Sequence, residues 1–156
     1  MKVVLAHGVF DLLHPGHIEH LQQARAFGDS LFVSVVPDRF AQKGRSLVYN
    51  EHERLFMLRS LRFVDDAILC RGPGPEYLLE ALRPDIYVRG SEYAAQDRPE
   101  YALVKELGIE VGFTKPIPLH TTNLLTRITC SPHEWHSMED GRVCSRCNAL
   151  DYSILL

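Results

Sequence analysis

The sequence has no long apolar run: stretches such as VVLA and LFV are far shorter than the roughly 20 residues of a membrane-spanning helix. It also has no excess of charge, because 17 Lys and Arg face 20 Asp and Glu, for a net charge of -3. This near balance provides no general attraction to nucleic acid or to an acidic membrane. The first residues, MKVVLAHG, lack the apolar core of a secretion signal, so we expect a cytoplasmic protein.

Internal repeats and low-complexity segments are also absent from the sequence. With 46% apolar and 24% charged residues, the composition is that of a globular protein, and 156 residues can bury a full core. Only four cysteines occur, and three of them, Cys130, Cys144 and Cys147, lie close together near the end. We therefore expect one main domain over residues 1–129 and a small appendage over residues 130–156.

Short apolar stretches, typical of buried strands, alternate with segments of helical periodicity over the main domain. Strands are expected over 2–6, 31–36, 64–69, 86–89 and 109–113, and helices over 17–27, 50–61, 76–82, 97–107 and 121–127. This alternation predicts an α/β fold with a doubly wound, five-stranded, mostly parallel sheet of the Rossmann-like kind. In such sheets ligands bind beyond the carboxyl ends of the strands.

The run GVFDLLHPGH, residues 8–17, directly follows the first predicted strand and opens the first helix. A helix N-terminus offers free N–H groups and partial positive charge, which suit a phosphate. Gly8 and Gly16 permit close backbone approach, and His14 and His17 are spaced so that both imidazoles can face one anion. The alternative is a pair of loop histidines, one of which caps the helix.

This run resembles the HxGH signature of the cytidylyltransferase-like nucleotidyltransferases, such as glycerol-phosphate cytidylyltransferase and the heptose-phosphate adenylyltransferases. The resemblance extends over residues 3–127. Its further motifs are PDRFAQKG from residue 37, NEHER from 50, LRFVD from 61, YVRGSEY from 87 and TTNLL from 121. The sequence departs from the family at Lys115 and His120, where arginine and serine are frequent, and at Pro116 and Pro118.

The resemblance implies transfer of a nucleotidyl group from CTP or ATP to a small phosphorylated sugar or polyol, with release of pyrophosphate. It implies His14, His17 and Lys43 as catalytic residues, Mg²⁺ as a cofactor and a homodimer as the assembly. The nucleotide-binding residues it implies are Gly8, Val9, Phe10, Asp11, Gly16, Gly90, Lys115, Thr121 and Thr122. Arg45 and Arg62 are candidates for contact with the acceptor phosphate, because the guanidinium fork suits that group.

Several of these residues have a simpler interpretation. Asp11 is open between a turn that fixes the loop and direct contact with a ligand or metal. Lys43 and Arg45 could be solvated charges, Thr121 and Thr122 a helix cap, and Arg54 the partner of a carboxylate. Cys70, at a strand end, is most simply a buried apolar residue.

The C-terminal residues contain a second pattern. Cys130 and His133 form a Cys-x2-His pair, and after ten residues Cys144 and Cys147 form a Cys-x2-Cys pair. Four such ligands suit a tetrahedral, structural Zn²⁺, with a hairpin between the pairs and His136 as an alternative ligand. A different class of function remains open, in which the α/β core binds a nucleotide without turnover and the zinc tail recognises a partner.

Overall fold

The computed structural model describes residues 1–41, 47–95, 97–115, 134–138, 141–144 and 150–151. The chain divides into two compact units, residues 1–118 and 119–156. The predicted boundary between residues 129 and 130 lies outside the described residues, as does the predicted helix over 121–127. Over the described ranges, no helix is both long and apolar enough to cross a membrane.

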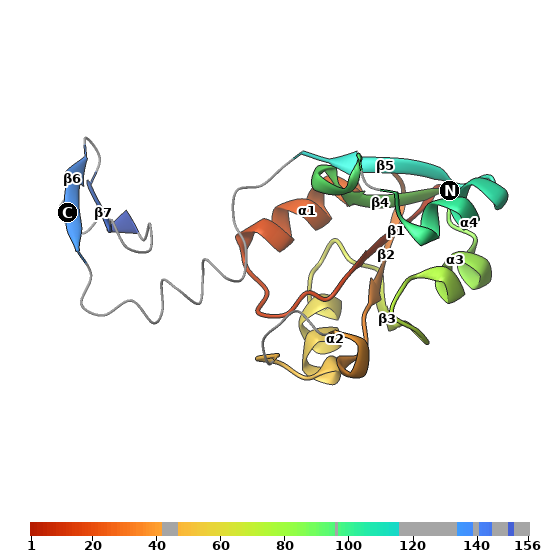
Figure 1. The fold of residues 1–156 in the computed structure, drawn as a ribbon, viewed down its shortest axis with the longest axis horizontal. Helices are drawn as coiled ribbons and strands as arrows, with labels where there is room; N and C mark the ends of the chain where they lie inside the picture. Colours follow the sequence, from red (N-terminus) through yellow and green to blue (C-terminus); the bar gives the residue numbers. More distant parts are fainter. Residues whose placement is uncertain (42–46, 96, 116–133, 139–140, 145–149, 152–156) are drawn as a thin grey trace. The chain divides into compact units, whose positions relative to one another are not determined.

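The first unit is built on a five-stranded sheet with the strand order β3-β2-β1-β4-β5 (Figure 1). All four pairings are parallel. The strands are β1 (Val3–Gly8), β2 (Ser30–Val35), β3 (Asp66–Leu69), β4 (Ile86–Gly90) and β5 (Glu110–Thr114). The predicted α/β fold with a doubly wound, five-stranded sheet is confirmed, and β1 and β4 flank the point at which the strand order reverses.

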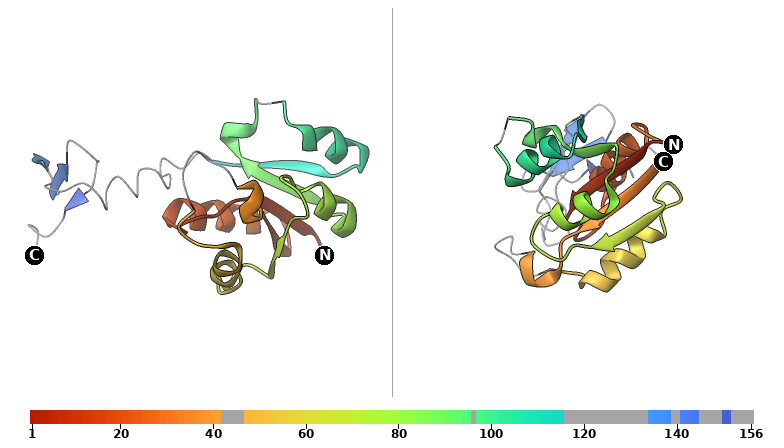
Figure 2. Two further views of the ribbon diagram at one scale, coloured as in Figure 1. Left: turned by 60° about the horizontal axis from the view of Figure 1, so that its bottom comes forward. Right: turned by 90° about the vertical axis from the view of Figure 1, so that its right-hand side faces the viewer.

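Over the residues of this unit that the structure describes, four helices cover the two faces of the sheet, α1 and α2 on one face and α3 and α4 on the other (Figures 1 and 2). They are α1 (Pro15–Arg25), α2 (Glu51–Arg59), α3 (Glu76–Leu82) and α4 (Pro99–Glu106); short 3-10 turns follow β2, η1 (Asp38–Phe40), and β4, η2 (Ser91–Tyr93). Side chains alternate between the faces along each strand. Val4 and Ala6 of β1 therefore join the core under α1 and α2, whereas Leu5 joins the core under α3 and α4.

The starts of helices α2 and α1 are marked by local sequence signals. Asn50 accepts from the N–H groups of His52 and Glu53, and the Glu53 carboxylate accepts from the Asn50 N–H, a complete capping box for α2. Helix α1 begins at Pro15, two residues before the predicted start, because proline suits the first turn of a helix.

The second unit contains a three-stranded antiparallel sheet of β6 (Trp135–Met138), β7 (Gly141–Cys144) and β8 (Leu150–Asp151). Strands β6 and β7 pair antiparallel, with Trp135 opposite Cys144 and Met138 opposite Gly141. The predicted hairpin between the two ligand pairs is thereby confirmed.

Candidate nucleotide-binding site

The loop from β1 to α1 carries backbone strain at two positions. Phe10 and Leu12 have φ angles of 54° and 55°, in the left-handed region that bulky residues rarely adopt. A Cβ atom on Gly8 would lie 3.0 Å from the Phe10 ring, so a larger residue there would require the ring to shift. Strain of this kind is frequent at binding and catalytic sites.

His14 is the N-cap of α1. Its Nδ1 accepts from the Gly16 N–H at 3.1 Å, and the residue is 5% exposed. Because Nδ1 is an acceptor, the proton of the neutral ring is on Nε2, which is therefore a hydrogen-bond donor. His14 therefore caps the helix, as one of the two sequence-based interpretations expected.

His17 lies beside His14 one turn into the helix. The two rings stack, with centroids 3.9 Å apart and planes inclined by 22°, and the Phe10 ring packs edge-on against His17 at 5.4 Å. The pair stands at the positive end of α1, as the spacing of the two histidines predicted.

Asp11 is 3% exposed and fixes a neighbouring segment. Its carboxylate accepts from the N–H of Val48 at 3.1 and 3.2 Å and from that of Tyr49 at 3.0 Å. These contacts favour the loop-fixing interpretation of Asp11. They tie the loop between β1 and α1, residues 9–14, to residues just before α2. This loop is called the histidine loop below because it leads to His14 and His17.

Replacing Asp11 with alanine removes a charged acceptor from two backbone N–H groups, so we expect the free energy of unfolding to fall by about 2–3 kcal/mol. Urea denaturation monitored by circular dichroism measures this loss. The matched control is Asp29→Ala, which removes an exposed carboxylate that accepts from the Lys2 N–H. Equal losses in the two variants would contradict the role given to Asp11.

Arg54 is completely buried and joins three segments around this loop. Its guanidinium donates to the Val9 carbonyl, to the Val36 carbonyl at 2.8 Å and to the Asp38 carboxylate at 2.7 Å. Asp38 in turn exchanges hydrogen bonds with Glu51 at the start of α2. The expected carboxylate partner of Arg54 is therefore found, together with two backbone contacts that the sequence did not indicate.

At the end of β4, Arg89 is held by the Tyr87 hydroxyl at 3.3 Å and by the Glu100 carboxylate at 3.8 Å. Its guanidinium lies 4.2 Å from the centroid of the Tyr93 ring. Burial raises the pKa of Tyr87 and keeps its hydroxyl protonated. Gly90, which follows Arg89, ends β4 beside this buried cluster.

The end of β5 is attached to α1 by two contacts. His20 Nδ1 lies 2.8 Å from the Thr114 hydroxyl, and the Lys115 N–H donates to the Gln23 side chain at 2.7 Å. These contacts hold Lys115 at the carboxyl ends of the strands. Burial lowers the pKa of His20 to about 4, partly opposed by Glu92.

The lowered pKa of His20 predicts that stability falls in acid. Between pH 6.5 and 4 the unfolded chain binds a proton at this residue and the folded chain does not, so the free energy of unfolding decreases as the pH falls, by on the order of 3 kcal/mol. Urea titrations across this range measure the slope. In His20→Gln the free energy of unfolding should depend less steeply on pH over this range. An unchanged dependence would mean that other groups cause the loss of stability in acid.

The structure places some predicted site residues together and others apart. Those at the carboxyl edge of the sheet are Gly8, Val9, Phe10, Asp11, His14, Gly16, His17, Gly90 and Lys115. Arg62 instead lies in the turn between α2 and β3, close to the start of β2, at the opposite edge. Lys43, Arg45, Thr121 and Thr122 lie outside the described residues.

The predicted zinc ligands are only partly within the described residues. Cys144 is the last residue of β7, whereas Cys130, His133 and Cys147 lie outside. Within the described ranges, no three His, Cys, Asp or Glu residues are grouped so as to hold a metal ion. The zinc site stays a prediction.

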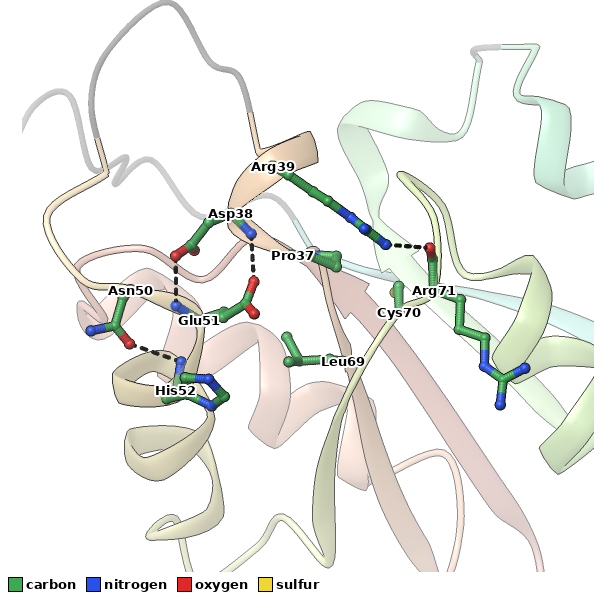
Figure 3. A pocket seen from close by; sticks show the side chains of 9 residues that line it. All are labelled: Pro37, Asp38, Arg39, Asn50, Glu51, His52, Leu69, Cys70 and Arg71. Atoms are coloured by element: carbon green, nitrogen blue, oxygen red, sulfur yellow. Dashed lines mark hydrogen bonds between the residues drawn. The ribbon is translucent and has the colours of Figure 1, made fainter.

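A cavity of about 720 Å³ opens at the carboxyl ends of β2 and β3 (Figure 3). It is lined by Pro37, Asp38, Arg39, Asn50, Glu51, His52, Leu69, Cys70 and Arg71. The sequence alone does not indicate this cavity, because η1, the start of α2 and the end of β3 meet only in the fold. The signal available in the sequence was an arginine after each of two neighbouring predicted strands, Arg39 and Arg71.

Comparison with known proteins agrees with this architecture. The model that defines the cytidylyltransferase-like family matches residues 5–129. The bifunctional protein HldE of Streptomyces coelicolor is 44% identical over 109 residues, covering 68% of this chain and 24% of that protein. The FAD synthase of Picrophilus torridus is 36% identical over 107 residues, covering 68% of this chain and 77% of that protein.

A solved structure is also similar. The lipopolysaccharide core biosynthesis protein from Thermoplasma volcanium superposes with a TM-score of 0.63 at 32% identity, covering 77% of this chain and 99% of that chain. The chain belongs to the cytidylyltransferase-like family, and the prediction of a nucleotidyltransferase enzyme is confirmed. It spans about a quarter of the length of HldE from Streptomyces coelicolor.

Proposed function

We propose that the protein transfers a nucleotidyl group from CTP or ATP to the phosphate of a small sugar or polyol and releases pyrophosphate. The observation that carries this proposal is the stacked His14–His17 pair at the N-terminus of α1. The family membership supports it, and the name FAD synthase on one relative supports the inclusion of ATP.

The reaction depends on positioning and electrostatic stabilisation. A phosphate oxygen of the acceptor is already a nucleophile at neutral pH, and the obstacle is its repulsion by the α-phosphate. His14 and His17 donate hydrogen bonds to the α-phosphate as charge develops on its oxygens, next to the positive end of α1. Lys43 neutralises the phosphates, Lys115 and the segment with Thr121 and Thr122 hold the departing pyrophosphate, and Arg45 contacts the acceptor.

Magnesium fits this proposal as an ion bound to the substrate. The Asp11 carboxylate already accepts from two backbone N–H groups, so phosphate and water oxygens would provide the ligands. Bound there, Mg²⁺ would lower the negative charge of the triphosphate.

A panel assay tests the proposal. Pyrophosphate release is measured with each common NTP and Mg²⁺ against sugar phosphates and polyol phosphates. We expect release that requires both an NTP and one acceptor class. Tight binding of an NTP without release, with every acceptor, would favour the alternative of a non-catalytic nucleotide-binding module.

For the tail, we propose one structural Zn²⁺ per chain, held by Cys130, His133, Cys144 and Cys147. The β6–β7 hairpin supports this proposal because it joins the two halves of the ligand pattern. Location in the cytoplasm and assembly as a homodimer stay predictions.

Cys144→Ser should lose the metal and unfold the tail, because so short a segment depends on the metal for its folding energy. Turnover should be largely retained. Metal analysis of protein purified without chelator measures the zinc content, and His136→Ala, which should keep the metal, is the matched control. Zinc lost from His136→Ala but kept in His133→Ala would reassign the fourth ligand.

A further inference from the structure

Three polar side chains from three neighbouring strands form a hydrogen-bonded trio, His7, Ser34 and Cys70. The Ser34 hydroxyl oxygen lies 2.9 Å from His7 Nδ1 and 2.8 Å from Cys70 Sγ, and Cys70 Sγ lies 3.7 Å from His7 Nδ1. Ser34 is fully buried and Cys70 is 5% exposed. The expectation that Cys70 is an apolar packing residue was incomplete, because it belongs to this polar cluster.

The strand register produces the trio. His7 pairs with Ser34 between β1 and β2, and Cys70 continues the ladder of β3 by donating its N–H to the Val35 carbonyl. Directly below, on the same sheet face, lie the apolar side chains Leu5, Phe32 and Ile68. Apolar residues would continue this core at no desolvation cost, so three polar residues in the next layer point to a role beyond packing.

The trio lies between two parts of the candidate site. His7 immediately precedes Gly8 and the histidine loop. At the other end, Cys70 lines the cavity shown in Figure 3. The trio therefore reaches from the strand that leads into the histidine loop to the wall of the cavity.

The hydrogen bonds in the trio have a preferred direction. Burial raises the pKa of the Cys70 thiol, which is therefore protonated and a donor. If it donates to the Ser34 oxygen, the Ser34 hydroxyl donates to His7 Nδ1, and the proton of neutral His7 is on Nε2. In the reverse order, His7 Nδ1–H donates to the Ser34 oxygen and the Ser34 hydroxyl donates to the Cys70 sulfur. Sulfur is a weak acceptor, so this order is less favourable.

The cavity beside Cys70 is lined by two arginines, Arg39 and Arg71, and two carboxylates, Asp38 and Glu51. Its carboxylates, Asp38 and Glu51, are already engaged with each other's N–H groups, and Asp38 also with the buried guanidinium of Arg54. Arg39 donates to the Arg71 carbonyl, and the Arg71 guanidinium lies over the ring of Tyr77.

We propose that the acceptor occupies this cavity and that Ser34 and Cys70 fix His7 as an Nε2–H donor to a phosphate or hydroxyl oxygen of the acceptor. This inference rests on the proposed function, and it assigns the acceptor to the β2–β3 side of the histidine loop. According to this proposal His7 contacts the acceptor, whereas Ser34 and Cys70 are positioning residues that orient His7.

The tautomer of His7 is the first test and needs no turnover. In full-length protein with ¹⁵N-labelled histidine, long-range ¹H–¹⁵N spectra at neutral pH should show the Nε2–H form of His7. Cys70→Ser, which keeps a donor, should retain this form, and Ser34→Ala should give a mixture of tautomers. A predominant Nδ1–H form in the wild type would overturn the proposal.

Acceptor binding is the second test. The acceptor with the lowest KM in the panel, or glycerol 3-phosphate if none turns over, should shift the His7 Nε2 resonance at millimolar concentration. Ser34→Ala should raise the KM for the acceptor about tenfold and leave the KM for NTP within twofold. An unshifted His7 signal on acceptor binding would overturn the proposal even with normal turnover, whereas absent turnover with a shifted signal would contradict only the proposed transfer reaction.

Discussion

Replacing His17 with alanine is expected to lower kcat by about a hundred- to a thousand-fold. Removal of one preorganised donor to a developing oxyanion costs about 3–4 kcal/mol of transition-state stabilisation. His14→Ala should show a loss of similar size, with some added loss of stability because His14 also caps α1. Steady-state pyrophosphate release measures both effects.

The matched control is Gln22→Ala, which changes an exposed side chain on the same helix. It should leave kcat unchanged, and all variants should keep the circular dichroism spectrum of the folded protein. Near-normal turnover in both His17→Ala and His14→Ala would mean that the stacked histidines are structural.

Replacing Arg54 with methionine is expected to lower the free energy of unfolding by about 3–5 kcal/mol. The substitution leaves two buried carbonyls, those of Val9 and Val36, and the Asp38 carboxylate without their donor. Urea denaturation measures the loss. Since Arg54 joins the histidine loop to the end of β2, turnover should fall as well.

Arg59→Met, on the same helix, is the control for Arg54. Its ion pair with Asp66 is about half exposed on both sides, so its loss should cost no more than about 1 kcal/mol. A comparably small loss for Arg54→Met would contradict the central structural role given to that residue.

The order of strands and helices could be predicted because each element carries its own local signal. Asn50 and Glu53 mark the start of α2, and Gly108 marks the end of α4 before β5. The histidine pair was also predictable, because its spacing and its place after a strand are both local features of the sequence.

The remaining parts of the site depend on the tertiary structure. His7, Ser34 and Cys70 are 27 and 36 residues apart along the chain, and only the strand register brings them together. Nothing local distinguishes the buried Arg54 from the exposed Arg59. Arg62 shows the converse. Its guanidinium made it a candidate for the acceptor phosphate, whereas the turn before β3 places it at the other edge of the sheet.

The most direct test of the account is to follow the α-phosphate of the nucleotide. With NTP labelled at the α-phosphorus, Mg²⁺ and the best acceptor from the panel, we expect the label to appear in the acceptor product and the unlabelled β- and γ-phosphates to leave as pyrophosphate. Label transfer should depend on the acceptor and be nearly lost in His17→Ala. Failure to transfer the α-label to any phosphate ester would contradict the account, and so would transfer of label in a parallel reaction with NTP labelled at the γ-phosphorus.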